Sequence, residues 1–197
     1  MKYILFILLL VGCSSSHNTK WIHLDEASST TTIRLVLQAG SADDPESKEG
    51  LTYLSVNSVV KNHESKFENL YAMGASLHTQ IDKEQSVIAA TVHQSHAEAL
   101  AQHFIDLFSK TSLKANAFEK SRAHALAQLN KLRTSDQEAL GKAQLENILY
   151  SDHPYSHPTV GTRNGLESAT LQDFLKHEKE YFCAGRVTVG VAGTIPS

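Results

Sequence analysis

The sequence predicts one α+β domain in which helices pack on a mostly antiparallel mixed sheet. Two segments alternate apolar and polar residues with the period of two typical of half-buried strands, two more form a strand pair around a charged turn, and others repeat apolar residues at helical spacing. The segments follow the order strand, helix, strands, three helices, helix, strand, without an internal repeat. A chain of 197 residues is long enough for one domain with a real core and short for two.

The predicted strands are short segments bounded by turn residues. In the first, Ile33, Leu35 and Leu37 share one face, and the strand ends before Gly40. The other predicted strands cover residues 77–81, 86–93 and 186–192. A charged turn at 82–84 joins the first two of these, so we expect them to form a hairpin.

The predicted helices are marked by capping boxes, in which a Ser or Thr and an acidic residue three positions later bond to each other's backbone N–H groups. Three such pairs precede apolar residues at helical spacing: Ser95 with Glu98, Ser135 with Glu138, and Thr170 with Asp173. A longer helix is predicted from 117 to 132, because Phe118, Ala125 and Leu129 recur with the helical period.

The first residues have the composition of a targeting segment. Lys2 is followed by an apolar run from Tyr3 to Val11, which is too short to cross a bilayer comfortably and is typical of a signal peptide. The run continues into Leu-Val-Gly-Cys13, which resembles a bacterial lipobox and so implies cleavage before Cys13 and lipid attachment to it. Ser14 resembles the default residue type for outer-membrane sorting. An ordinary signal peptide with a chance cysteine is the alternative.

These features divide the chain into a signal peptide (1–12), a lipidated tether (13–20) and a single folded domain (21–197). We therefore expect a protein of the bacterial cell envelope, lipid-anchored in the outer membrane and facing the periplasm. Removing residues 1–12 takes away one lysine, so 17 basic side chains face 21 acidic ones and the formal charge is −4. No basic tract indicates a nucleic-acid partner, and none is expected.

Several stretches follow one another in the order found in a known peptidase family. They are Ala39-Gly40-Ser41, Glu49-Gly50-Leu51, Gly74 to Leu77 with Asp82, His153-Pro154-Tyr155, Gly161-Thr162, and the segments 171–181 and 187–193. From about residue 22 to 195, the chain resembles the N-terminal domain of the M16 peptidases, the insulinase and pitrilysin family. The resemblance implies an M16 peptidase-like fold of the LuxS and mitochondrial processing peptidase type.

The resemblance also implies where a zinc site would lie. Family members carry an inverted zinc motif, H-x-x-E-H, on the helix that opens Gly-Leu, and a third ligand, a glutamate, on a later helix. In this chain Tyr53 and Asn57 stand at the two histidine positions. Val56 stands at the position of the general-base glutamate, and Gln128 at that of the third ligand. We call residues 53, 56, 57 and 128 the four motif positions.

The four motif positions predict a domain without zinc and without peptidase activity. Tyr53 would have to lose a proton with a pKa near ~10, while Asn57 and Gln128 offer only neutral amide oxygens. Val56 cannot accept a proton from water, so the general base is missing as well. We expect no cofactor, no catalytic residue, and a helix face repacked against its neighbours.

Three functions are compatible with such a domain. The first is a non-catalytic, chamber-forming subunit that partners a zinc peptidase with an intact H-x-x-E-H motif, and the membrane is the second partner through the lipid anchor. The second is a truncated or split M16 chain without independent activity, whose partners would be the remaining M16 domains. The third is a lipid-anchored binding or scaffold protein. We favour the first.

Overall fold

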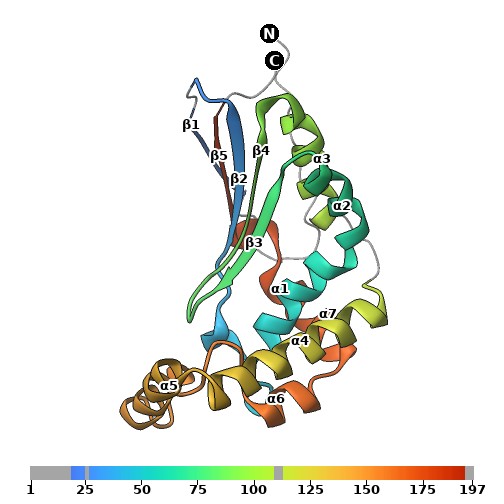
Figure 1. Ribbon diagram of the computed structural model, residues 1–197. Coiled ribbons are helices and arrows are strands. Elements are labelled where there is room, and N and C mark those ends of the chain that lie inside the picture. Colours follow the sequence, from blue (N-terminus) through green and yellow to red (C-terminus); the bar gives the residue numbers. More distant parts are fainter. Residues whose placement is uncertain (1–18, 25–26, 109–112, 194–197) are drawn as a thin grey trace.

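The computed structural model describes residues 19–24, 27–108 and 113–193. The predicted signal peptide (1–12) and the predicted lipid attachment site, Cys13, lie outside these residues. The molecule is built from a sheet with helices gathered on one of its sides (Figure 1). This arrangement confirms the predicted α+β class.

The sheet has five strands in the spatial order β1-β5-β2-β4-β3. Their bounds are β1 Lys20–Leu24, β2 Thr30–Leu37, β3 Ser76–Ile81, β4 Ser86–His93 and β5 Val187–Ala192. The strand β1 runs parallel to β5, and the three other neighbouring pairs are antiparallel. The sheet is therefore mixed and mostly antiparallel, as predicted, and β1 is an additional strand that the sequence patterns did not indicate.

Seven α-helices lie within the described residues. Their bounds are α1 Leu51–Asn62, α2 Glu64–Ala72, α3 Ala97–Phe108, α4 Ala115–Thr134, α5 Gln137–Leu149, α6 Arg163–Ser168 and α7 Leu171–Tyr181. The predicted helices are confirmed, whereas α2 and α6 were not predicted. Nowhere in the described ranges does a helix have the length and apolar character needed to span a membrane.

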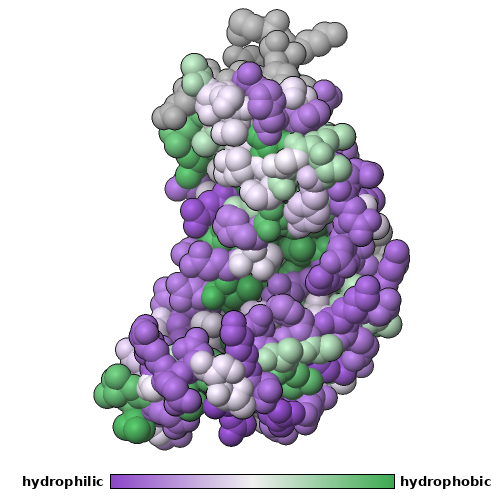
Figure 2. Space-filling view, in the orientation of Figure 1, coloured by the Kyte–Doolittle hydropathy of each residue, from purple (hydrophilic) through white to green (hydrophobic). Residues whose placement is uncertain are grey.

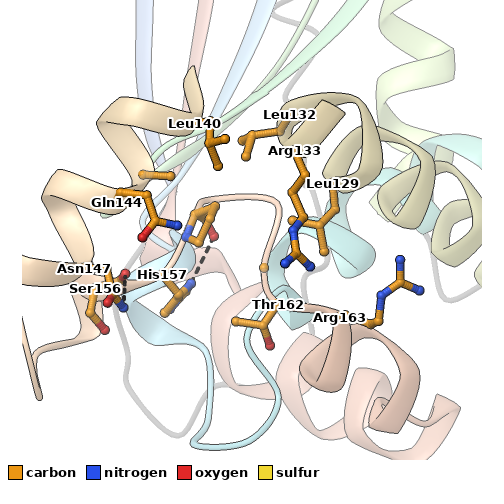
Figure 3. Close-up of a pocket in the computed structure, with 13 residues that line it drawn as sticks. Leu129, Leu132, Arg133, Leu140, Gln144, Asn147, Ser156, His157, Thr162 and Arg163 are labelled. Carbon is orange, nitrogen blue, oxygen red and sulfur yellow. Dashed lines mark hydrogen bonds between the residues drawn. The ribbon is translucent and has the colours of Figure 1, made fainter. Parts of the chain in front are cut away.

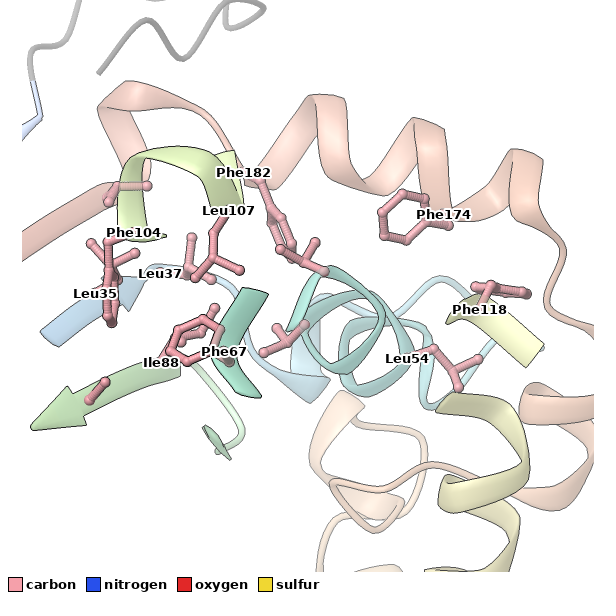
Figure 4. Close-up of a cluster of buried hydrophobic side chains, with 14 of the residues drawn as sticks. Leu35, Leu37, Leu54, Phe67, Ile88, Phe104, Leu107, Phe118, Phe174 and Phe182 are labelled. Carbon is pink, nitrogen blue, oxygen red and sulfur yellow. The ribbon is translucent and has the colours of Figure 1, made fainter. Parts of the chain in front are cut away.

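One hydrophobic core lies between the sheet and the helices. Along β2 the residues Ile33, Leu35 and Leu37 are buried in alternation with more exposed neighbours, as the period of two predicted. Large side chains from the helices belong to the same core cluster, among them Phe67 of α2 and Phe174 of α7, whose ring lies beside Phe118 of α4 (Figure 4). Because α1 contacts β3, α4 and α7, it is the central helix of the domain.

The helix starts agree with the predicted capping boxes in one case of three. At α7, Thr170 and Asp173 bond to each other's backbone N–H groups as expected. At α5 the N-cap is Asp136, whose side chain accepts from the Ala139 N–H, so the prediction for Ser135 was wrong. At α3, Ser95 lies in a preceding 3₁₀ turn and its hydroxyl bonds to a histidine ring instead.

Candidate functional site

The helix α1, which carries three of the four motif positions, begins at a tightly built corner. Gly50 precedes it with φ 104°, and a Cβ at Gly50 would lie 2.8 Å from the Val160 carbonyl oxygen. Both facts favour glycine there, because residues with a side chain rarely adopt this backbone conformation and neighbouring atoms already fill the space that a Cβ would need. The Asp44 carboxylate lies at the same corner and accepts hydrogen bonds from the backbone N–H groups of Gly50 (2.6 Å) and Thr52 (2.7 Å).

Val56 faces the protein interior. It is 0% exposed and belongs to the hydrophobic core cluster. A carboxylate at this position would have to leave water for apolar surroundings, which is costly without a partner. The packing of Val56 therefore agrees with the predicted repacking of this helix face.

Tyr53 and Asn57 lie one turn apart on α1, and the structure brings them together. The Asn57 side-chain amide donates to the Tyr53 backbone oxygen at 2.9 Å, and the Asn57 side-chain oxygen accepts from the Thr79 hydroxyl of β3 at 3.2 Å. Tyr53 is partly buried and packs against the core, and burial raises the pKa of its hydroxyl above the ordinary value. The asparagine thus ties α1 to the neighbouring strand.

Gln128, the fourth motif position, lies on α4 and is exposed. The helix α4 packs against α1, and its buried residues include Ser121, Ala125 and Leu129. Gln128 therefore sits on a helix next to α1, with its side chain in contact with solvent. Within the described ranges, no three His, Cys, Asp or Glu side chains gather in a way that could hold a metal ion.

A buried polar network at the start of α1 was missed by the sequence patterns. The Thr52 hydroxyl donates to the Gly40 carbonyl oxygen (3.0 Å) and also lies 3.0 Å from Nε2 of His177 on α7. Because the hydroxyl donates its one proton to Gly40, the His177 ring donates to the hydroxyl, which requires a proton on Nε2. Residues 52 and 177 are far apart in sequence, so no local signal could have paired them.

Burial shifts the pKa values of two titratable groups at this corner, Asp44 and His177, in opposite directions. Desolvation raises the pKa of Asp44 to about 6, although the hydrogen bonds from Gly50 and Thr52 act to lower it. Desolvation also lowers the pKa of His177 to about 4, so its neutral form is favoured. Both groups are therefore held in a largely dry environment next to the helix N-terminus.

A cavity of about 270 Å³ lies between α4, α5 and the loop before α6 (Figure 3). Its wall is mainly apolar, with Leu129, Leu132 and Leu140 on the helices and Pro158 on the loop. Arg133 and Arg163 stand at one side of it. None of the four motif positions lines this cavity.

Comparison with known proteins identifies related chains. The family model described as Insulinase (Peptidase family M16) matches residues 22–163. A protein named probable mitochondrial-processing peptidase subunit beta, from Schizosaccharomyces pombe, is 24% identical over 174 residues, covering 84% of this chain and 37% of its own length. The chain thus spans little more than a third of that relative.

Two of the solved structures with the same fold are bacterial proteins. The peptidase M16 inactive domain from Pseudomonas fluorescens superposes with a TM-score of 0.78 at 18% identity, and a protease from Helicobacter pylori with 0.80 at 14%. In both cases the match covers 94% of this chain and 46% of the other. At these identities the likeness establishes the fold alone, in a chain about half as long as those compared.

Proposed function

The chain belongs to the insulinase family of M16 peptidases, and from that membership we propose that it is a non-catalytic M16 subunit that partners a zinc-bearing M16 chain. The main support for the proposal is that α1 holds a central position in the fold and buries an apolar residue at the general-base position. The helix keeps its place at the centre of the fold, while Val56 is fully buried at the position where the family carries its general base. We infer that the domain keeps the M16 fold and lacks the zinc-dependent hydrolysis.

The residues at the metal positions do not suit zinc. Tyr53 would bind as the phenolate, and burial raises its pKa and so disfavours that form. Asn57 already uses its amide group and its oxygen in hydrogen bonds, and as a neutral ligand it is weak. Gln128 contributes another neutral amide. No hydrolytic step therefore runs through these residues.

The names of related proteins support a role beside another chain. One similar structure is called an M16 inactive domain, and one relative is called a subunit of a processing peptidase. By analogy, the partner proposed here is an M16 chain with an intact H-x-x-E-H motif, whose peptide chamber this domain would help to form. Because this chain covers under half of the matched structures, that larger assembly is part of the proposal.

The proposed location is the periplasmic face of the outer membrane, reached through a lipid on Cys13. The support is the lipobox-like sequence that ends at Cys13, followed by Ser14. Placed there, the domain would meet its catalytic partner in the cell envelope.

Two measurements test the proposal. The purified chain should contain far less than about one zinc per molecule by elemental analysis and should not cleave unfolded peptides. Affinity capture of the tagged chain from its own cell envelope should bring down an M16 chain with an intact motif, identified by mass spectrometry.

A matched variant makes the capture specific to the folded domain. Leu54→Asp places a charge at a fully buried core position, so this variant should keep the anchor sequence and lose the partner. Stoichiometric zinc with peptide cleavage would overturn the non-catalytic assignment. Capture of the chain without any M16 partner would overturn the subunit role and favour a split or truncated M16 chain.

A further inference from the structure

The strand β1 exposes an apolar patch at one end of the sheet. Its residues Trp21, Ile22 and Leu24 are 46%, 45% and 58% exposed, and we call these three residues the β1 patch. Figure 2 shows hydrophobic colouring over this part of the molecule, at the upper left. All five residues of β1 are exposed, so the strand adds little to the core.

The apolar side chains of the β1 patch project from both faces of the strand. Trp21 pairs with Val189 of β5, whereas Ile22 and Leu24 pair with Gly190 and Ala192. Successive side chains in a strand point to opposite faces, so Trp21 lies on one face and the other two lie on the opposite one. Glycine and alanine are small and give Ile22 and Leu24 little cover.

The position of the β1 patch in the chain connects it with the membrane. Trp21 follows Cys13 by eight residues, which can span at most about 28 Å when fully extended. A lipid on Cys13 would therefore hold this end of the domain close to a bilayer. A tryptophan next to aliphatic side chains is the combination that favours the boundary between headgroups and acyl chains.

We propose that the β1 patch rests in the surface of the lipid bilayer and orients the domain there. The proposal rests on the anchoring suggested above, but not on the catalytic partner. Lys20 precedes the patch in the sequence and Asp25 and Glu26 follow it, so apolar insertion rather than charge attraction provides the contact. A surface held in this way fixes which side of the domain faces the periplasm.

The test uses Trp21 as its own reporter, because it is the only tryptophan of the chain. The full processed chain is reconstituted into vesicles of phosphatidylethanolamine and phosphatidylglycerol, with or without bromine on the acyl chains. We expect emission at shorter wavelength than in detergent-free buffer, quenching by the brominated lipid, and no change at high salt.

Two double variants make the test specific. Ile22→Ser with Leu24→Ser should lose most of the quenching while leaving the reporter in place. Leu145→Ser with Ile148→Ser removes exposed apolar side chains from α5 and should leave the quenching unchanged. Circular dichroism checks that both variants are folded.

Several results would overturn the patch. One is a Trp21 emission that acrylamide quenches freely and brominated lipid does not. Another is a spectral shift that grows with the number of protein copies per vesicle, which would indicate contact with a second copy. Mass spectrometry of residue 13 in the same sample separates membrane contact of the β1 patch from lipid attachment at Cys13. A lipidated Cys13 with unquenched Trp21 refutes only the membrane contact. An unmodified Cys13 with quenched Trp21 refutes only the lipid attachment.

Discussion

Two of the four motif positions, Val56 and Gln128, differ strongly in solvent exposure. Val56 is enclosed by the core, whereas Gln128 is in contact with solvent. The same change, to the carboxylate that the family carries, therefore has different consequences at the two positions. At position 128 a charge would remain hydrated, and at position 56 it would not.

We expect Val56→Glu to lower the free energy of unfolding by roughly 3 kcal/mol or more, because it buries an acidic group without a partner. Gln128→Glu is the matched control and should change it by less than about 0.5 kcal/mol. Urea unfolding followed by circular dichroism measures both. Similar effects of the two substitutions would contradict the burial of Val56.

The residues Asp44 and His177 make opposite contributions to the pH dependence of stability. The pKa of Asp44 in the folded protein, about 6, exceeds its ordinary 3.8, so its contribution to stability is lost as the pH rises from about 4 to 6. The pKa of His177, about 4, lies below its ordinary 6.5, so its contribution is lost as the pH falls from about 6.5 to 4. The two contributions largely cancel in the wild-type chain.

We expect His177→Gln to expose the contribution of Asp44. Glutamine can still donate to the Thr52 hydroxyl but does not titrate, so the free energy of unfolding should fall by on the order of 2 to 3 kcal/mol between pH 4 and 6. The wild-type chain should show a much smaller slope. Urea unfolding at several pH values measures the difference, and equal slopes would rule out the opposing pair.

The helices α7 and α5 differ in the hydrogen bonds that cap their N-termini. The helix α7 begins with a reciprocal capping box, in which Thr170 accepts from the Asp173 N–H (3.1 Å) and Asp173 accepts from the Thr170 N–H (2.9 Å). The helix α5 has a single cap from Asp136 and no buried residue. Its residues Leu145 and Ile148 are 55% and 73% exposed, so α5 contributes less to the core than its apolar sequence suggests.

At the start of α7, Thr170→Ala should lower the free energy of unfolding by about 1 kcal/mol, the usual effect of losing an N-cap. Ser135→Ala is the control, because the structure gives the cap of α5 to Asp136 instead. This control should change stability by less than about 0.5 kcal/mol. Thermal and urea unfolding measure both. A larger effect at Ser135 would indicate that Ser135 caps α5, as the sequence pattern predicted.

The whole molecule presents apolar side chains at two distant places, over β1 and over α5 (Figure 2). Between them, the sheet and helices share a single core cluster. The strand β1 lies at the end of the molecule opposite the helices α5 and α6 (Figure 1). An anchor before β1 would therefore attach the domain by one end, with the helices α5 and α6 pointing away from it.

Anchoring predicts a simple effect of Cys13→Ser in the cell. The wild-type chain should incorporate a labelled fatty acid and fractionate with the outer membrane, whereas the variant should incorporate none. The substitution lies before the folded domain, so protease resistance of the purified domain should be unchanged. Equal labelling of both chains would refute lipid attachment at Cys13.

The sequence by itself determined what depends on local order. The period of two in residues 33–37 and the helical spacing in 117–132 predicted β2 and α4, because these periods follow from the geometry of one strand or helix. The stretches resembling M16 predicted the family, which the comparisons confirm. The residue types at positions 53, 57 and 128 already predicted poor zinc ligands, a prediction that stays open to measurement.

Only the tertiary structure decided what depends on contacts between distant residues. It buried Val56 and exposed Gln128, and it joined Thr52 to His177 across 125 positions of sequence. It also placed β1 at the edge of the sheet beside β5, which follows it by more than 160 residues. The physical reason is that burial and pairing are set by which elements meet in space, and a periodic pattern shows only which face of an element is apolar.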